Sequence, residues 1–229
     1  MKKIIDGICV EVSWRKVKKI RIKIDKYKGV QLVIPNGVSE KTGIAFLNKN
    51  LDWVKTNLAK RPAVKKFDFC DGAGFFFFGK EVSLRVVKSQ RKSFILNPDE
   101  IILYNPSVDK ESIKSHLFDI LKKILRDRSK LYFDKWESLT GLKSTSLRVT
   151  QAQTRWGSCN CQTRAINLSV YLACMPEFCL DYVILHEISH IRYANHGQQF
   201  KAMLTKYMPE WRAVRDFMKN NSSKMKLYV

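Results

Sequence analysis

The sequence predicts an α+β protein: a β-rich region with one helix over residues 1–105, followed over residues 106–229 by a mainly helical region with a small antiparallel sheet. Three observations support this prediction. Apolar and polar residues alternate in several short runs before residue 105, apolar residues recur at helical spacing after Pro106, and alternation returns between residues 147 and 172. A chain of 229 residues with 45% hydrophobic residues can bury one good core or two smaller ones.

The first region reads as two hairpins separated by a helix. Residues 19–24 (KIRIKI) and 29–37 (GVQLVIPNG) both alternate, so we expect two half-buried strands paired across a turn near Gly29. From Ser39 the apolar residues follow helical spacing as far as Leu58, which predicts one amphipathic helix. Residues 72–106 return to strand-like runs, and their four consecutive phenylalanines are assigned to core packing rather than to a ligand site.

The second region begins with a long helical pattern. Its apolar stripe runs from Ile113 through Trp136, and Gly141 is expected to end the helix. His116 lies in this helix and is expected to be partly exposed. The runs around Leu147–Val149 and over residues 166–172 predict another hairpin, and three further helices follow, at about 176–190, 200–207 and 211–217.

Composition limits the classes of function. The chain has 42 lysines and arginines against 21 aspartates and glutamates, a net charge of +21, which would attract nucleic acid or another polyanion. No nucleic-acid motif accompanies the charge, so a solvated lysine-rich surface is the simpler interpretation. No signal peptide or apolar stretch of ~20 residues is recognisable, which predicts a soluble cytoplasmic protein without a membrane partner.

The six cysteines show no C-x-x-C spacing and are expected to be free thiols in a reducing compartment. Cys159 and Cys161 are separated by one residue, and a contribution to a metal site is the less favoured alternative.

The sequence H-E-I-S-H at residues 186–190 carries the strongest chemical signal. On a helix, His186 and His190 are rotated by only about 40° and lie one turn apart, so both imidazoles can bind one ion. Glu187 lies about 100° further round, where it can reach a water molecule near that ion. The surrounding residues are apolar, and burying three polar side chains without partners would cost several kcal/mol, so the pattern predicts a bound metal.

A zinc site of this kind needs a third protein ligand, and His196 is the nearest candidate. The helix must end before His196 for it to reach the same ion, and Asn195 and Gly197 are expected to provide that end. Glu210 is the alternative ligand. The spacing H-E-x-x-H-x5-H matches metzincins, but Tyr193 replaces their glycine and no Met-turn follows, so that class is not assigned.

Several motifs together resemble the YgjP-like metallopeptidase family: TRWGSC at 154–159, INLSVYL at 166–172, DYVILHEISH at 181–190 and NH at 195–196, with IPNGVS, LDWV and FFFFGKEVSLRVV in the first half. The resemblance spans almost the whole chain. It implies a zincin-like domain over residues 106–229, with His186, His190 and His196 as ligands of Zn²⁺ and Glu187 as the catalytic glutamate. The sequence departs from the family pattern at Cys159-Asn160-Cys161, which replaces a more usual turn containing serine or glycine.

We therefore expect a zinc-dependent peptidase acting on a peptide or protein substrate. Tyr193 or Arg155 is the expected donor to the transition-state oxyanion. By resemblance to zincins, the strand at 166–172, which carries Asn167 on its polar face, is expected to bind extended substrate. Two alternatives are a metal-dependent UTP pyrophosphatase, which the absence of a phosphate-binding loop argues against, and a basic nucleic-acid-associated protein with a structural zinc.

Overall fold

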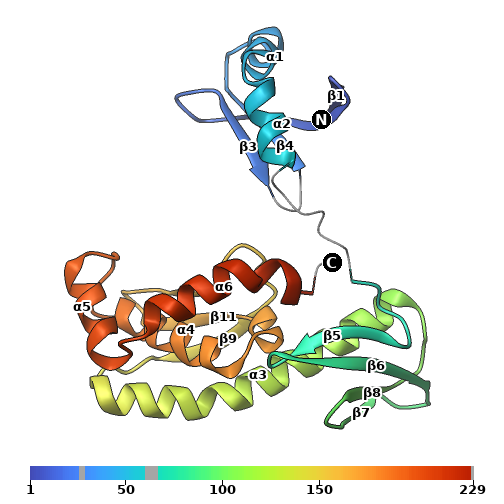
Figure 1. Cartoon of the computed structure of the whole chain (residues 1–229), viewed down its shortest axis with the longest axis vertical. Helices are drawn as coiled ribbons and strands as arrows, with labels where there is room; N and C mark the ends of the chain where they lie inside the picture. Colours follow the sequence, from blue (N-terminus) through green and yellow to red (C-terminus); the bar gives the residue numbers. More distant parts are fainter. Residues whose placement is uncertain (26–28, 60–66, 228–229) are drawn as a thin grey trace. The chain divides into compact units, whose positions relative to one another are not determined.

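The computed structural model describes residues 1–25, 29–59 and 67–227 (Figure 1). The chain divides into two compact units, an N-terminal unit, Met1–Lys65, and a C-terminal unit, Lys66–Val229. Each unit is described by itself. The mixture of helices and strands agrees with the predicted α+β class.

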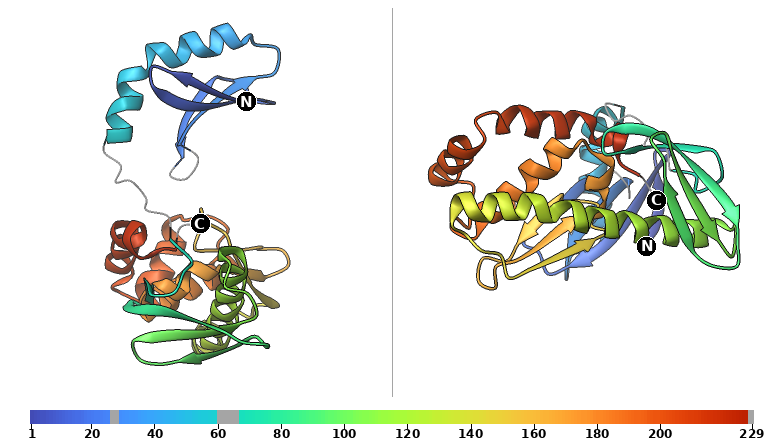
Figure 2. Two further views of the ribbon diagram at one scale, coloured as in Figure 1. Left: turned by 90° about the vertical axis from the view of Figure 1, so that its right-hand side faces the viewer. Right: turned by 90° about the horizontal axis from the view of Figure 1, so that it is seen from below.

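The N-terminal unit is a four-stranded sheet covered on one face by two helices (Figure 2). The strands are β1 (Lys2–Ile5), β2 (Ile8–Arg15), β3 (Arg21–Asp25) and β4 (Gly29–Pro35), in the order β1-β2-β4-β3. The antiparallel pairing of β3 with β4 confirms the predicted hairpin, while β2 pairs with β4 in parallel. Side chains on the covered face form a separate core with the helices: Val10, Val12, Val30, Leu32, Ile34, Leu47 and Val54.

The single helix expected after Ser39 is two helices, α1 (Glu40–Lys49) and α2 (Leu51–Ala59). The Ser39 side chain caps the start of α1 by accepting from the Thr42 N–H. At Asn50 the backbone leaves the helical region, with φ −113° and ψ 14°, and the side-chain amide donates to the Phe46 carbonyl. Asparagine favours such local side-chain bonds to the backbone, which compete with a continuous helix.

The C-terminal unit begins with a second four-stranded sheet. Its strands are β5 (Ala73–Phe77), β6 (Lys80–Lys88), β7 (Ser93–Leu96) and β8 (Glu100–Asn105), in the order β5-β6-β8-β7. The tip of the β5–β6 hairpin has positive φ at Phe78 and Gly79. This tip is attached to the rest of the unit, because the Phe78 N–H donates to the Ala173 carbonyl (2.7 Å) and Gly79 packs closely on Pro176.

The third sheet has three strands, β9 (Ser146–Thr150), β10 (Gly157–Cys159) and β11 (Ala165–Ser169), in the order β10-β11-β9. The prediction of a hairpin between the runs now seen as β9 and β11 was wrong: these strands are parallel, and β11 forms its hairpin with β10. The sheet is therefore mixed rather than antiparallel. The strand expected to reach residue 172 ends at Ser169, where a 3₁₀ helix, η1 (Val170–Cys174), begins. All five η1 residues are buried, so the apolar residues of this segment pack into the core in all directions rather than on one face of a strand.

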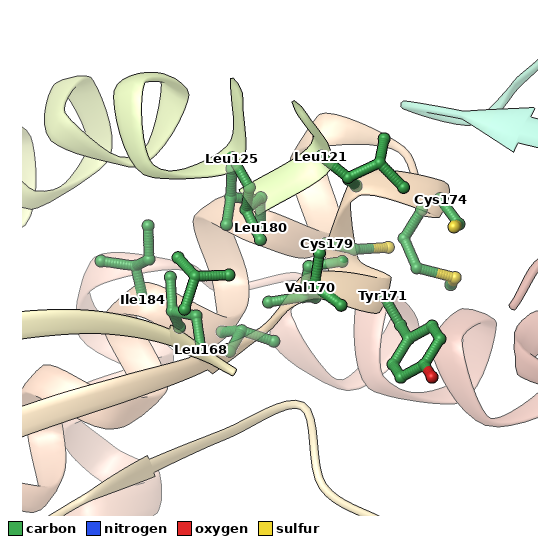
Figure 3. Close-up of a cluster of buried hydrophobic side chains, with 14 of the residues drawn as sticks. Leu121, Leu125, Leu168, Val170, Tyr171, Cys174, Cys179, Leu180 and Ile184 are labelled. Carbon is green, nitrogen blue, oxygen red and sulfur yellow. The ribbon is translucent and has the colours of Figure 1, made fainter. Parts of the chain in front are cut away.

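Four α-helices complete the unit: α3 (Lys110–Thr140), α4 (Glu177–His190), α5 (Gln198–Tyr207) and α6 (Trp211–Met225). Gly141 ends α3 in the left-handed conformation, φ 70°, as predicted. Leu121 and Leu125 of α3 pack on Leu180 and Ile184 of α4 (Figure 3). The long helix α3 thus supports the helix that carries the histidines.

The division between the units lies at residues 65/66, whereas the sequence placed the domain boundary at residues 105/106. The physical reason is a shared core: Phe75, Leu84 and Leu103 of the second sheet belong to the same buried cluster as Leu117 of α3 and Tyr171 of η1. His116 also differs from expectation, because it is 6% exposed and lies in this buried region. None of the helices in the described part of the chain has both the length and the apolar character needed to cross a membrane.

Candidate metal centre

The helix α4 carries two of the three candidate ligands and is buried on most of its circumference. It begins after Pro176 and ends at His190. Apolar side chains anchor it on several sides, with Leu180, Ile184 and Ile188 fully buried. Because the helix is locked in place by this packing, the positions of His186 and His190 on it are fixed by the fold rather than by the metal.

The chain leaves α4 immediately after His190. The N–H groups of Ile191, Arg192 and Tyr193 donate to the carbonyls of Ile188 and Ser189, which tightens the last turn. The expectation that Asn195 and Gly197 end the helix was wrong, since α4 ends at His190 and neither residue has the positive φ of a left-handed helix end. Instead the Asn195 side chain accepts from the Gly197 N–H (3.2 Å), and this turn presents His196 just before α5.

The structure brings His186, His190 and His196 together. One ring nitrogen of each lies within 4.8 Å of the others, and the ring centroids are 4.7–5.0 Å apart. Nε2 of His186 and Nε2 of His196 are separated by 3.0 Å. Within the described ranges 1–25, 29–59 and 67–227, this is the one group of three or more His, Cys, Asp or Glu side chains with such convergent ligand atoms.

The groups behind the imidazoles orient them. His190 Nδ1–H donates to the Tyr193 carbonyl (2.9 Å), and Nδ1 of His186 lies 3.4 Å from the Tyr182 hydroxyl. With Nδ1 protonated in both rings, the lone pairs of Nε2 are free for a metal. Phe200 of α5 is 2% exposed, and its ring centroid lies 4.7–4.9 Å from all three imidazole centroids. One buried phenyl ring therefore supports the whole cluster.

These residues fit a zinc ion. With Zn–N bonds of about 2.0–2.1 Å, two nitrogens of a tetrahedral site lie about 3.3 Å apart. Nε2 of His186 and Nε2 of His196 are 3.0 Å apart, and the three ligand nitrogens all lie within 4.8 Å of one another. Burial, together with the neighbouring His190 and His196, lowers the pKa of His186 to about 3, and burial also lowers the pKa of His190. Both imidazoles are thus kept in the neutral form that coordinates metals.

Glu187 is 5% exposed and lies against the edge of the third sheet. A Cβ built on Gly157 of β10 would lie 2.5 Å from Glu187 Oε1, so only glycine allows this approach. Burial raises the pKa of Glu187 to about 8, an effect that the charge of Arg155 partly opposes. A carboxyl group with such a pKa is suited to exchange protons near neutral pH.

Arg155, Asn167 and Tyr193, which were predicted to contact the substrate or the transition state, lie outside the histidine cluster. Arg155 is exposed, and it lines a cavity of about 300 Å³ together with Ser158 and Asn167. Asn167 donates to Ser158 Oγ (3.5 Å) on the face of the sheet opposite Gly157, so its side chain is not brought to the histidines. Tyr193 provides its carbonyl to His190, while its side chain lines another cavity, with Thr140 and Tyr207 among the neighbours.

Cys159 and Cys161 do not belong to the convergent group of ligand atoms. Burial raises the pKa of Cys159 to about 11, so its thiol is unreactive near neutral pH. The alternative ligand Glu210 precedes α6 and is also outside the cluster.

Three residues that contribute to the site were missed by sequence reasoning: Tyr182, Gly157 and Phe200. Gly157 gave a usable signal, because glycine inside a strand pattern often marks a close approach of another group. Tyr182 lies one helical turn before His186 and could have been found from that spacing. Phe200 gave no signal beyond its place in the α5 pattern, because its contact depends on how the chain turns after His190.

The fold and the site together define the class: an α+β protein with a three-histidine candidate metal centre built on a buried H-E-x-x-H helix. The sequence profile described as YgjP-like, metallopeptidase domain, matches residues 18–221, and the chain belongs to this family. A comparison with curated proteins gave no significant match.

Two solved structures show a limited similarity to the chain. The metallopeptidase zymogen of Pyrococcus abyssi abylysin has 16% identity and a TM-score of 0.38, over 42% of this chain and 98% of its own. The metallopeptidase zymogen of Methanocaldococcus jannaschii jannalysin has 22% identity and a TM-score of 0.36, over 43% of this chain and 96% of its own.

Proposed function

We propose that the protein is a zinc-dependent peptidase in which His186, His190 and His196 bind the metal and Glu187 is the general base. The observation that carries the proposal is the convergence of three imidazoles beside a buried glutamate. Three neutral nitrogen ligands suit zinc and leave a fourth position open, as in catalytic zinc sites. When bound, the metal would supply a Lewis acid that acidifies a water molecule and polarises the substrate carbonyl.

Glu187 carries out both proton transfers of the reaction. Glu187 takes a proton from the attacking water and passes it to the amine that leaves when the C–N bond breaks. Its raised pKa, about 8, makes it a sufficiently strong base for the first transfer and a sufficiently strong acid for the second. Gly157 holds the carboxyl group at the sheet edge by offering no side chain against it.

Substrate binds along β10 rather than along the strand expected from the sequence. The central position of β11 in the order β10-β11-β9 means that both of its edges are already paired. β10 is an edge strand, and its Gly157 contacts Glu187, so an extended peptide added to this edge passes beside the general base. Arg155, whose charge already acts on Glu187, is the side chain that stabilises the developing oxyanion.

The test combines metal analysis with two activity assays. Purified protein should contain close to one zinc per chain, and His196→Ala should reduce that content. Glu187→Gln should retain zinc and lose peptide hydrolysis by about 10²-fold or more, because general-base catalysis contributes that much. A parallel assay with UTP separates the alternative: Glu187-dependent hydrolysis of UTP without peptide hydrolysis would overturn the proposal, and so would full peptidase activity in Glu187→Gln.

A further inference from the structure

The N-terminal unit is far more basic than the rest of the chain. Residues 1–65 contain 16 lysines and arginines and five aspartates and glutamates, a net charge of +11, whereas the remaining 164 residues contribute +10. Half of the excess positive charge is therefore concentrated in less than a third of the chain. The candidate metal centre, on α4 and the turn after it, does not explain this asymmetry.

The charge is concentrated further within one segment. Between Glu11 and Asp25 the sequence holds six cations and no carboxylate: Arg15, Lys16, Lys18, Lys19, Arg21 and Lys23. All six are exposed, and none forms an ion pair within the part of the chain that the structure describes. Other lysines of this unit do pair, Lys3 with Glu40 and Lys55 with Asp6. These six residues are called the basic segment below.

The strand register gathers the basic segment at one end of the sheet. Arg15 pairs with Pro35 and Arg21 pairs with Val33, so the loop of residues 16–20 passes across the end of β4. Ile22 and Ile24 pack towards the helix-covered core, which leaves Arg21 and Lys23 on the open face, about 6.6–6.8 Å apart along β3. The cations thus form a line along a strand and its connecting loop rather than a scattered surface.

An exposed aromatic ring lies at the same end. Trp14 immediately precedes the basic segment, pairs with Ile34 and is 40% exposed. Its indole N–H donates to the Val38 carbonyl (3.1 Å), which holds the ring in place while leaving part of it in solvent. Trp14 points to the same, helix-covered side of the sheet as its partner Ile34, whereas Arg21 and Lys23 point to the open side. The cations next to the ring are therefore those of the loop that follows it in the chain, Lys16, Lys18 and Lys19. Cations next to an exposed aromatic ring are the combination by which proteins bind the phosphates and stack the bases of single-stranded nucleic acid.

We propose that the N-terminal unit binds single-stranded nucleic acid, with the basic segment contacting phosphodiester groups and Trp14 stacking on a base. The proposal does not depend on peptidase activity. Single-stranded RNA and DNA share this chemistry, and duplex DNA, acidic polypeptides and anionic membranes are competing ligands that the experiment distinguishes.

The experiment measures fluorescence anisotropy of labelled 20-mers of single-stranded RNA, single-stranded DNA and duplex DNA with the full-length protein over a range of salt concentrations. Lys16→Gln/Lys18→Gln/Lys19→Gln should reduce affinity for both single strands by tenfold or more at low salt. It should also make the salt dependence shallower by about 2 in the log–log slope, since each lost phosphate contact contributes about 0.7. Circular dichroism checks that each variant is folded.

The matched control, Lys110→Gln/Lys114→Gln/Lys122→Gln, removes three charges from ion-paired positions on α3, where Lys110 is exposed and Lys114 and Lys122 are half-buried. It should change affinity by less than twofold. Equal losses in the two triple variants would mean that only net charge matters and would overturn the proposal. Binding of polyglutamate or of vesicles rich in phosphatidylserine as tight as binding of the single strands would also overturn it.

A pair of substitutions tests the stacking residue. Trp14→Phe keeps an aromatic ring but loses the hydrogen bond to Val38, whereas Trp14→Leu loses both. Stacking predicts that Trp14→Leu weakens single-strand binding several-fold more than Trp14→Phe while leaving duplex binding unchanged. Equal effects of the two substitutions, or a loss confined to duplex DNA, would contradict the role of Trp14.

Discussion

Gly157 of β10 lies directly against the carboxyl group of Glu187, so that a Cβ on Gly157 would be 2.5 Å from Oε1 and 2.9 Å from Cδ. The absence of a side chain at residue 157 therefore allows the Glu187 carboxyl group, the proposed general base, to lie against β10. We expect Gly157→Ala to displace Glu187 and lower kcat by about 10²-fold, because a shift of about 1 Å in a catalytic group has that effect. Zinc content, measured by elemental analysis, should not change.

A control is available at Gly74 of β5, an exposed strand glycine of the same C-terminal unit. A Cβ at Gly74 would meet only Glu81 Oε1, at 3.9 Å. Gly74→Ala should retain nearly full activity. Equal activity of both variants would show that Gly157 does not position Glu187.

The ring of Phe200 contacts all three imidazoles, so its removal should affect both zinc affinity and the stability of the protein. Phe200→Ala should lower the free energy of unfolding by roughly 3–5 kcal/mol, as for other buried phenylalanines, and weaken zinc binding because the rings lose their common support. Chelator competition measures the zinc affinity, and urea denaturation measures stability. Phe178→Ala is the control, since Phe178 is 46% exposed, and it should change neither quantity substantially.

The hydroxyl of Tyr182 is the partner of His186 Nδ1, at 3.4 Å. Removing it in Tyr182→Phe should weaken zinc binding by roughly tenfold, the low end of the range for such outer partners, because the contact is long. Tyr132→Phe is the control. It removes a partly buried hydroxyl that donates to Glu177 (2.8 Å), and it should leave zinc affinity unchanged. A zinc affinity equal to wild type in Tyr182→Phe would mean that packing alone orients His186.

Features that depend on local spacing could be predicted from the sequence, and features that depend on distant partners could not. The extent of α3 follows from its apolar stripe and from Gly141, whose left-handed conformation needs no information from elsewhere. The break at Asn50 was missed because Val54 continues the helical spacing beyond it. Alternation in β11 identified its buried face but not its neighbours, since the pattern contains no information on strand order or direction.

The same distinction applies to the site. His186 and His190 are brought together by one turn of helix, and their spacing of four residues predicts this directly. The turn that brings His196 back to the other two histidines uses hydrogen bonds of Tyr193 and Asn195. The sequence shows that such a turn is required for three histidines to bind one ion, but it does not show the geometry of the turn. The contact of Glu187 with Gly157 joins residues 30 positions apart through the packing of α4 on the third sheet, and no local pattern contains it.

The position of the unit boundary has a direct consequence for truncated proteins. A fragment of residues 67–229 should fold and bind zinc, whereas residues 106–229 should not, because they lack Phe75, Leu84 and Leu103, which fill the same core as Leu117 and Tyr171. Circular dichroism and zinc titration of the two fragments provide the measurement. A folded, zinc-binding 106–229 fragment would restore the boundary expected from the sequence.

The pKa values of Glu187 and His186 predict how the stability of the metal-free protein depends on pH. Glu187 ionises near 4.5 in the unfolded chain but near 8 in the folded protein, so between these values the unfolded state binds fewer protons and stability falls as pH rises. His186 titrates near 6.5 unfolded and near 3 folded, so between 3 and 6.5 the unfolded state binds more protons and stability rises with pH.

The two effects oppose each other between pH 4.5 and 6.5, and the effect of Glu187 is the larger one above pH 6.5. We therefore expect the free energy of unfolding, measured by urea denaturation in the presence of EDTA, to fall by roughly 1 kcal/mol between pH 6.5 and 8. Glu187→Gln cannot ionise and should remove this decrease. If the variant shows the same decrease as the wild type, the ionisation of Glu187 is not its cause, and the carboxyl group is already charged in the folded metal-free protein.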